Sequence, residues 1–482
     1  MSETRYDVII LGKGLAGLFG GSFLLGRGLK VLSLSHGEGL GEHFSESAPL
    51  DHLSLQRQGY VFEPFGGLFT GLQEEGLRKA IEGLGLPSVF APLEPGLQVV
   101  LPGQRVSLFS RDDWFWRELE REFPEDLQGF KRLSEVFSRV EKGLLDFLSE
   151  DKTDKGDRWP SKGKALHAWI RLLPYRWKAL PSLLDENGLG YDSRLFIEAL
   201  TTFFFNADSL SFSIPLTAIL WGLLRSGLYS YKGGLIGLAR DLEKAFLERG
   251  GEVRFLDPGE WVNVFLKKEV QVKTEREIFR ARYLLIEEGQ KARVFIRTSP
   301  WMLWKPRNKD IPYPGPRREA LVLLIGVKEE ILPSEMREHL ILYGDGSENG
   351  PLFLSLSPPW DESRAPKGCQ ALSATLFMAP NTQEAPQDSL AEEALYRLED
   401  FIPSLRRYID YFETLKIEVK GPIPRKFPLI ELARLRTGMR GLSQKRPVSP
   451  LFYIDDQALP GGKGIFSLLP AFRLAEAILK EG

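Results

Sequence analysis

The chain has 482 residues, of which 43% are hydrophobic and 27% charged, the balance of an ordinary globular protein, so long disorder and fibrous repeats are excluded. Its 63 Lys and Arg against 65 Asp and Glu give a formal net charge of −2. This near-neutral total argues against nucleic acid as a partner, because phosphate backbones are bound through concentrated Lys and Arg.

The first forty residues predict a strand, a glycine turn, a helix and a second strand. An apolar strand at 8–11 runs into Gly12-Lys-Gly14-Leu15-Ala16-Gly17, helical spacing follows, and 29–35 is again apolar. In this setting the glycines are a dinucleotide-binding fingerprint. Gly12 permits the tight turn, Gly14 lets the backbone approach a pyrophosphate, and Gly17 lets the helix pack on the strand. We therefore expect the free N–H groups at the helix start to face an anion.

The residue that would bind the ribose is less regular. Ser35 stands at the end of the second strand, where the fingerprint places an acid, and Glu38 follows in the next loop. Either side chain can hydrogen-bond a ribose hydroxyl, and both are candidate cofactor residues. No arginine stands beside Ser35 to receive a 2′-phosphate, so NADP is not favoured.

Three further blocks follow the fingerprint in order, and each contains a pair of adjacent glycines. They are 59–67 (GYVFEPFGG), 231–254 (YKGGLIGLA, a helix and RGGEVR) and 451–480 (LFYIDD, PGGKGI and a closing helix). With these blocks the chain resembles the flavin-dependent oxidoreductases that include phytoene desaturases, carotenoid isomerases and, more distantly, amine oxidases. The resemblance implies FAD as cofactor and an apolar polyene or lipid as substrate, with amine oxidation as a further alternative.

The resemblance also implies a fold and the remaining site residues. The fold class is α/β, with an FAD/NAD(P)-binding Rossmann-like domain (1–75, 231–300 and 421–482) interleaved with an α+β substrate domain carrying a helical cap (76–230 and 301–420). The C-terminal block implies that Asp456, Gly462, Gly464 and Ile465 hold the ribityl and ring end of the flavin. No general base is assigned, because an apolar C–H donor needs little acid–base help.

Some residues depart from the family pattern and support a hypothesis from a different class. Ser35 replaces the acid, Glu42 stands roughly where arginine is common, and Asp455 replaces a glycine. Adjacent carboxylates disfavour a pyrophosphate. The alternative is a retained fold with weak or no cofactor binding that serves as a protein partner or lipid-binding subunit.

Two middle regions allow both a functional and a plain structural interpretation. Residues 111–180 have helical patterns in which aromatic residues stand among Lys and Arg, as in peripheral membrane contact or in the amphipathic helices of a cap. Residues 196–231 are dense in aromatic and apolar residues, as in the wall of a substrate pocket or in a helical core.

Metal and nucleophile chemistry have no sequence support. The five histidines show no ligand spacing, the lone Cys369 permits no internal disulfide, and no GxSxG turn is present. The polar N-terminus is no secretory signal, and the longest apolar stretch is half of a bilayer span. We expect a cytoplasmic protein with possible peripheral membrane contact.

Overall fold

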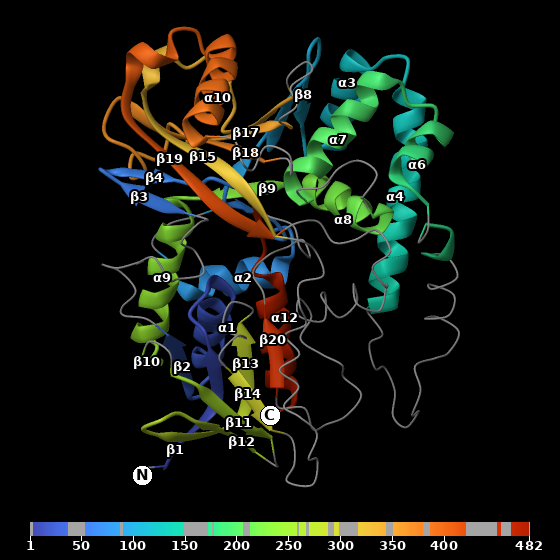
Figure 1. Cartoon of the computed structure of the whole chain (residues 1–482). Coiled ribbons are helices and arrows are strands. Elements are labelled where there is room, and N and C mark those ends of the chain that lie inside the picture. Colours follow the sequence, from blue (N-terminus) through green and yellow to red (C-terminus); the bar gives the residue numbers. More distant parts are fainter. Residues whose placement is uncertain are drawn as a thin grey trace.

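A computed structural model describes most of the chain. The described residues are 3–36, 54–86, 90–148, 172–175, 178–205, 213–257, 260–266, 269–287, 294–297, 317–343, 350–378, 386–420, 451–454 and 464–481. The ribbon has a lower part, which holds both ends of the chain, and an upper part with a second sheet and a group of helices (Figure 1).

An eight-stranded sheet forms the lower part. Its order is β10-β2-β1-β13-β12-β11-β14, and β20 pairs with the second half of β13. The strands β10, β2, β1, β13 and β20 run parallel. The central strands β1 and β13 are apolar at 8–11 and 284–286, because both faces of the sheet are covered there, as in doubly wound α/β folds. The bounds are β1 (Glu3–Leu11), β2 (Val31–His36), β10 (Glu252–Leu256), β11 (Val262–Leu266), β12 (Val270–Lys273), β13 (Ile278–Glu287), β14 (Val294–Arg297) and β20 (Leu451–Ile454).

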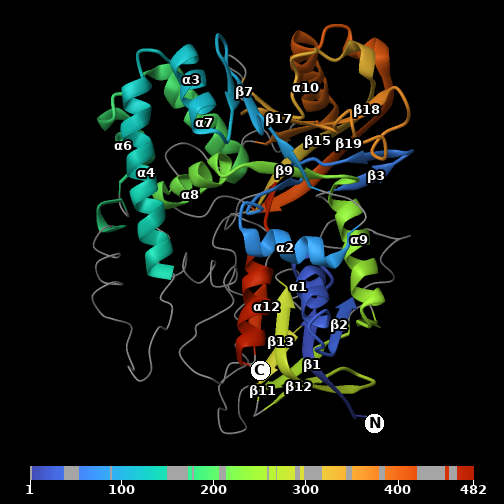
Figure 2. The same cartoon turned by 180° about the vertical axis from the view of Figure 1, so that it is seen from behind.

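One face of this sheet shares a buried core with four helices. They are α1 (Leu15–Leu25), α2 (Glu75–Leu84), α9 (Gly234–Glu248) and α12 (Leu469–Glu481). Every residue of α1 is buried, because α9 and α12 both pack against it. Figure 2 shows α1 from behind, with α12 on one side of it and α9 on the other. The predicted opening strand, helix and strand, and the predicted α/β class, are confirmed.

The upper part is built on a seven-stranded, largely antiparallel sheet. Its order is β19-β15-β18-β17-β16-β7-β8, with α10 (Gln387–Phe401) packed in the apolar core on one face. The bounds are β7 (Leu97–Val100), β8 (Arg105–Leu108), β15 (Arg317–Lys328), β16 (His339–Leu342), β17 (Leu352–Leu356), β18 (Cys369–Phe377) and β19 (Ile409–Lys420). Short 3₁₀ turns, η3 (Glu329–Ile331) and η4 (Leu405–Tyr408), flank it.

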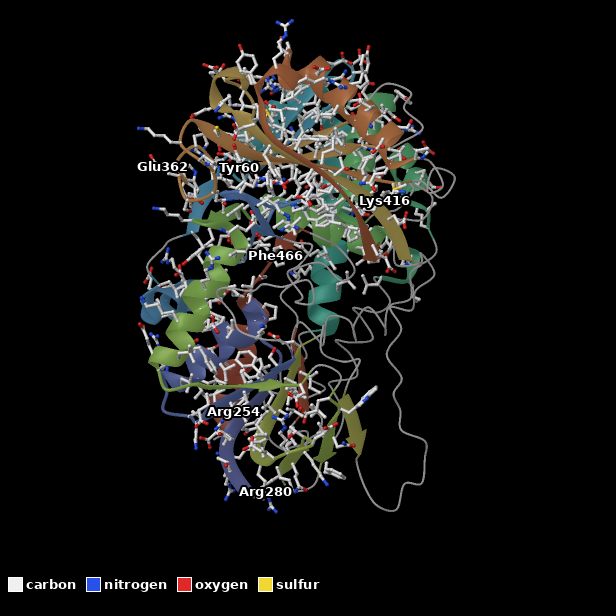
Figure 3. The ribbon with its side chains drawn as sticks, turned by 60° about the vertical axis from the view of Figure 1, so that its left-hand side comes forward. Tyr60, Arg254, Arg280, Glu362, Lys416 and Phe466 are labelled. Atoms are coloured by element: carbon white, nitrogen blue, oxygen red, sulfur yellow. The ribbon has the colours of Figure 1, made fainter. Side chains whose placement is uncertain are left out.

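A small sheet joins distant parts of the chain between the two large sheets. Its order is β21-β5-β9-β6, and a separate hairpin joins β3 to β4. Figure 3 shows Phe466 of β21 below Tyr60 and Lys416 of the upper part and above Arg254 and Arg280 of the lower part. The bounds are β3 (Leu55–Arg57), β4 (Tyr60–Phe62), β5 (Leu68–Phe69), β6 (Phe90–Leu93), β9 (Leu228–Tyr231) and β21 (Ile465–Phe466).

Helices complete the upper part. They are α3 (Asp112–Glu122), α4 (Leu127–Leu148), α6 (Leu180–Glu186), α7 (Tyr191–Phe205) and α8 (Ile214–Arg225). The predicted helical patterns at 114–120 and 130–148 are confirmed as α3 and α4, whereas the third, at 165–173, lies almost entirely outside the described residues. None of the helices that the structure describes is both long enough and apolar enough to cross a membrane.

Candidate functional site

The turn between β1 and α1 has the geometry that the glycine pattern requires. Gly12 adopts φ +128°, a conformation that a residue with a Cβ rarely reaches. Its N–H donates to the Leu34 carbonyl at 2.8 Å, and the Ser33 hydroxyl donates to the Gly12 carbonyl at 2.8 Å. The turn is therefore fixed against β2, and the start of α1 lies at the carboxyl edge of the parallel strands, where α/β folds bind ligands.

A carboxylate already lies at the start of α1. The N–H of Gly14 donates to Oε2 of Glu287 at 2.5 Å, and the N–H of Gly17 donates to Oε1 at 2.8 Å. Glu287 is the last residue of β13 and is 6% exposed. The N–H groups of this turn thus converge on an anion, as predicted. The anion is a side chain of the protein itself.

The four sequence blocks meet around α1. The helix of the third block, α9, and that of the fourth, α12, both pack on α1, where Gly20 faces Ala471 and Gly21 faces Phe246. In the small sheet, β21 of the fourth block pairs in parallel with β5, directly after the second block. The tertiary structure therefore assembles blocks of which the first and the last are more than four hundred residues apart in the sequence.

Gly464 needs to be glycine at this meeting point. It has φ +76°, and a Cβ there would overlap the Phe65 carbonyl oxygen. Its own carbonyl accepts from the Leu68 N–H at 2.9 Å, and the neighbouring Ile465 is fully buried. These two predicted cofactor residues therefore lie beside the second block.

The other predicted site residues are placed as follows. Ser35 is buried at the end of β2, opposite Phe255 of β10. Leu15 and Ala16 are buried in the first turn of α1, where their side chains belong to the core. Three predicted cofactor residues, Glu38, Asp456 and Gly462, lie outside the described residues, as do Glu42 and Asp455.

A buried ion pair at the start of α9 was not predicted. Glu63 accepts from the Leu235 N–H at 2.6 Å and lies 3.1 Å from Nη1 of Arg364, and the two charged side chains are 1% and 2% exposed. Asp361 accepts from the Gly233 N–H at 2.6 Å. Burial raises the pKa of Glu63, and the charge of Arg364 opposes that rise. Glu63 belongs to the second block, but its partner is three hundred residues away, so sequence reasoning missed the pair.

His339 lies against the same cluster and among aromatic rings. Its ring is nearly parallel to Phe353 with centroids 6.2 Å apart, and Phe353 stacks on Phe203 at 3.8 Å. A Cβ on Gly66 would come 3.3 Å from Nδ1 of His339. Burial, reinforced by the charge of Arg364, lowers the pKa of His339 to about 3. The imidazole is therefore neutral at physiological pH.

The residues of the first turn fit the phosphate part of a dinucleotide. In this fold the pyrophosphate is held by N–H groups at the N-terminus of the first helix. Here the N–H groups of Gly14 and Gly17 converge on one anion, and no Cβ at Gly12 closes the space. A flavin dinucleotide would take the position that the Glu287 carboxylate holds.

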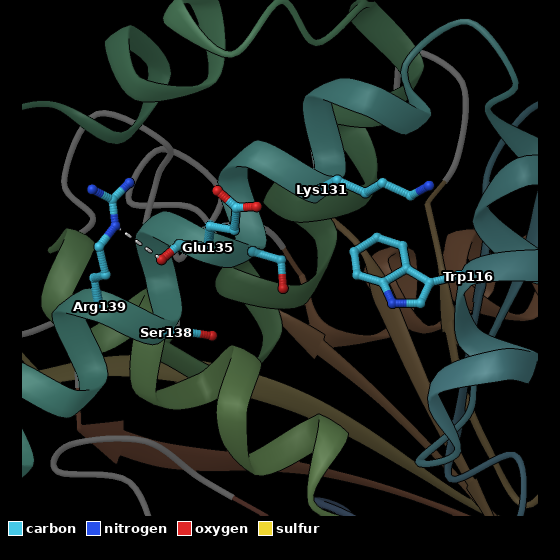
Figure 4. Close-up of a pocket in the computed structure, with 6 residues that line it drawn as sticks. Trp116, Lys131, Glu135, Ser138 and Arg139 are labelled. Carbon is cyan, nitrogen blue, oxygen red and sulfur yellow. Dashed lines mark hydrogen bonds between the residues drawn. The ribbon is translucent and has the colours of Figure 1, made fainter.

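A pocket of about 510 Å³ lies elsewhere, between α3 and α4 (Figure 4). Its lining is polar and mixed in charge, and Arg139 donates within α4 to the Glu135 carbonyl at 3.3 Å. The lining residues are Trp116, Lys131, Ser134, Glu135, Ser138 and Arg139. Within the described ranges, no group of three or more His, Cys, Asp or Glu side chains is arranged to hold a metal ion.

Comparisons with known proteins agree with this geometry. The chain is 23% identical to the chloroplastic prolycopene isomerase of Arabidopsis thaliana, over 95% of this chain and 80% of the plant protein. The same enzyme of Daucus carota is also 23% identical, over 95% of this chain and 77% of that protein. No family model matches the chain.

Two amine oxidases are among the solved structures with the same architecture. Cyclohexylamine oxidase from Brevibacterium oxydans has a TM-score of 0.63 at 16% identity, with 99% of each chain covered. Putrescine oxidase bound to putrescine has a TM-score of 0.58 at 13% identity, again with 99% of each chain covered. The resemblance drawn from the four blocks is confirmed: the chain is similar over nearly its whole length to carotenoid isomerases, and it has the fold of amine oxidases.

Proposed function

We propose that this protein is an FAD-dependent oxidoreductase that acts by hydride transfer on an apolar polyene or lipid. The observation that carries the proposal is the glycine turn of α1, whose N–H groups converge on an anion where the four blocks meet. Full-length similarity to prolycopene isomerases supports it. A bound flavin supplies the hydride acceptor or donor, and the protein supplies position and electrostatics.

Each part of the turn has a role toward that cofactor. The backbone N–H groups of Gly14 and Gly17 would bind the pyrophosphate, and Gly12 keeps the approach open. Gly464 and Ile465 would lie at the ring end, beside the second block. Ser35 or Glu38 would bind the ribose, and Asp456 with Gly462 the ribityl chain, as the family resemblance implies.

The character of the neighbouring side chains favours an apolar substrate. Phe65, Phe203, Phe353 and Phe377 are buried and contact one another between the second block and the large upper sheet. The neutral His339 adds a flat ring to this cluster and no charge. An apolar polyene suits such surroundings better than a charged amine, since a cation would lose its hydration there.

Two alternatives remain open to test. Glu287 in the phosphate position favours the subunit with weak or no cofactor binding, which would act as a protein partner or lipid-binding protein. An amine oxidase would need an aromatic cage at the flavin. Three tryptophans are candidates for such a cage: Trp360 is 43% exposed, and Trp301 and Trp304 lie outside the described residues.

Peripheral membrane contact through 111–180 is part of the proposal. Trp114 at the start of α3 is 40% exposed, and the guanidinium carbon of Arg111 lies 4.6 Å from its ring centroid. An exposed aromatic ring beside a cation suits a lipid headgroup region.

The visible spectrum of the purified protein, with and without incubation in excess FAD, tests the function. We expect flavin absorbance that survives gel filtration after incubation and that reduced substrate or dithionite bleaches. Gly14→Val should abolish this binding, because the branched side chain would take the pyrophosphate's place. Full flavin retention in that variant would contradict the assignment of the turn, and absence of binding in the wild type at any FAD concentration would favour the cofactor-free subunit.

A further inference from the structure

The carboxylate of Glu287 fills the space that the glycines of the turn leave open. A Cβ built on Gly12, Gly14 or Gly17 would come within 3.0 Å of a Glu287 carboxylate oxygen. The same oxygens accept from the N–H groups of Gly14 and Gly17. We call the backbone of 12–17 the cradle. One side chain of β13, that of Glu287, therefore occupies the space of the cradle and accepts its hydrogen bonds.

The sheet directs Glu287 into this cradle. Leu11 of β1 lies opposite Ile286 of β13, so residue 287 extends one position past the end of β1, at the turn. Side chains alternate along a strand. Leu285 belongs to the core under α1, and Leu284 and Ile286 to the core of the opposite face. Glu287 therefore lies on the α1 side because of its register.

Chemistry explains why a carboxylate is stable there. Burial of an ionised carboxyl group is costly unless donors compensate it. Two backbone N–H groups and the positive end of the α1 dipole provide that compensation. These are the same groups that bind a dinucleotide phosphate in this fold. Because two anions repel each other and the space holds one, the carboxylate and a pyrophosphate exclude each other.

We propose that Glu287 is an internal competitor that controls cofactor access to the cradle, an inference that rests on the proposed function. Binding of the flavin requires the side chain to leave Gly14 and Gly17, and its return favours release. When the binding-competent form is a small fraction of the population, the apparent dissociation constant rises by the inverse of that fraction. A competent fraction of about one in a hundred would weaken FAD binding about a hundredfold.

The experiment compares FAD and ADP binding to the full chain by isothermal titration calorimetry and flavin fluorescence. Glu287→Ala removes both charge and volume and should lower the dissociation constant for FAD at least tenfold. Glu287→Gln removes the charge, keeps the volume and retains an acceptor for one N–H, so it should have an intermediate effect and keep the fold. Circular dichroism checks that each variant is folded.

Glu260 offers a matched control. It is also a buried glutamate that accepts two backbone N–H bonds, from Asp257 at 3.0 Å and from Glu275 at 2.7 Å, and it lies at the sheet's far loops. Glu260→Gln should leave FAD binding unchanged. A tightening of the same size in this variant would overturn the proposal, because the effect would then not be specific to the cradle.

The outcomes separate this inference from the proposed function. Equal FAD affinity in the wild type and in Glu287→Ala supports the flavin assignment and overturns the competition. Tighter ADP binding in Glu287→Ala, with FAD bound by no variant, supports the competition and overturns the flavin assignment. Binding of neither ligand by any variant overturns both.

Discussion

Two helices of this protein begin in the same way but serve different purposes. Both α1 and α9 follow a glycine turn, and each receives a buried glutamate from a distant part of the chain. Glu287 accepts from Gly14 and Gly17 at the start of α1, and Glu63 accepts from Leu235 at the start of α9. In both places a carboxylate satisfies N–H groups that have no partner within the helix.

The partners of the two carboxylates differ. Glu63 also faces the buried Arg364, with Oε2 and Nη1 3.1 Å apart. Asp361 accepts a hydrogen bond from the neighbouring Gly233 N–H. The anion at the start of α9 is therefore part of a buried ion pair. Glu287 holds the position that a cofactor phosphate takes in this fold. The comparison teaches that a helix start is a general anion site, and that its surroundings decide whether the anion is structural or exchangeable.

Arg364→Leu should have the largest effect. Removal of one partner leaves a buried charge uncompensated, and such changes cost about 3–5 kcal/mol. Urea unfolding followed by circular dichroism measures the loss. The double variant Glu63→Gln/Arg364→Leu keeps an acceptor for the Leu235 N–H without the charge. It should recover most of the free energy of unfolding that the single variant loses. A loss below about 1 kcal/mol in the single variant would show that the pair is not structural.

Asp361→Ala should have the next largest effect. Asp361 is 2% exposed and accepts from the Gly233 N–H and from the Ser363 hydroxyl, at 2.6 and 2.5 Å. Hydrogen bonds to charged groups contribute about 1.5–3 kcal/mol. Asp361→Asn keeps an acceptor and should cost clearly less in the same urea unfolding experiment. An equal loss of free energy of unfolding in both variants would mean that the charge of Asp361, and not its hydrogen bond, stabilises the start of α9.

His339 should make stability depend on pH. Its folded pKa of about 3 lies below the ordinary value of 6.5, so the unfolded chain binds more protons between these values. The contribution to stability is therefore complete above pH 6.5 and is lost as the pH falls toward 3, by up to about 1.4 kcal/mol per pH unit. Unfolding from pH 7 to pH 4 should show a weaker pH dependence in His339→Gln than in the wild type. Parallel curves would contradict a buried neutral imidazole.

The smallest expected effect separates backbone strain from crowding at the α9 turn. Gly234 has φ +66° and a Cβ there would meet the Glu63 carboxylate, whereas Gly250 has φ +82° with no atom within 4 Å. Gly250→Ala should cost about 1–2 kcal/mol for the left-handed conformation alone. Gly234→Ala should cost more, because Glu63 must also move. Thermal unfolding of the two variants under one condition compares their stabilities. An equal loss of stability would show that the Glu63 carboxylate moves away from the new Cβ at no cost.

The sequence predicted the local parts of this molecule well. The apolar strand at 8–11, the glycine turn and the following helix form β1 and α1, because their signals depend on neighbouring residues. The order of the four blocks also led to the resemblance to carotenoid isomerases and amine oxidases that the comparisons confirm. The roles of Asp456, Gly462 and Glu38 stay predictions, and so do the domain boundaries.

Only the tertiary structure revealed which anion each helix start holds. Glu287 is 270 residues or more from its donors, and Glu63 is 172 residues from Leu235. In the sequence Glu287 is merely an acid after an apolar strand, and nothing local says which turn it will face. The pairing of β13 with β1 decides that, because register sets the position and face of every side chain. The sequence by itself thus determined that an anion site exists, and the long-range packing decided what occupies it.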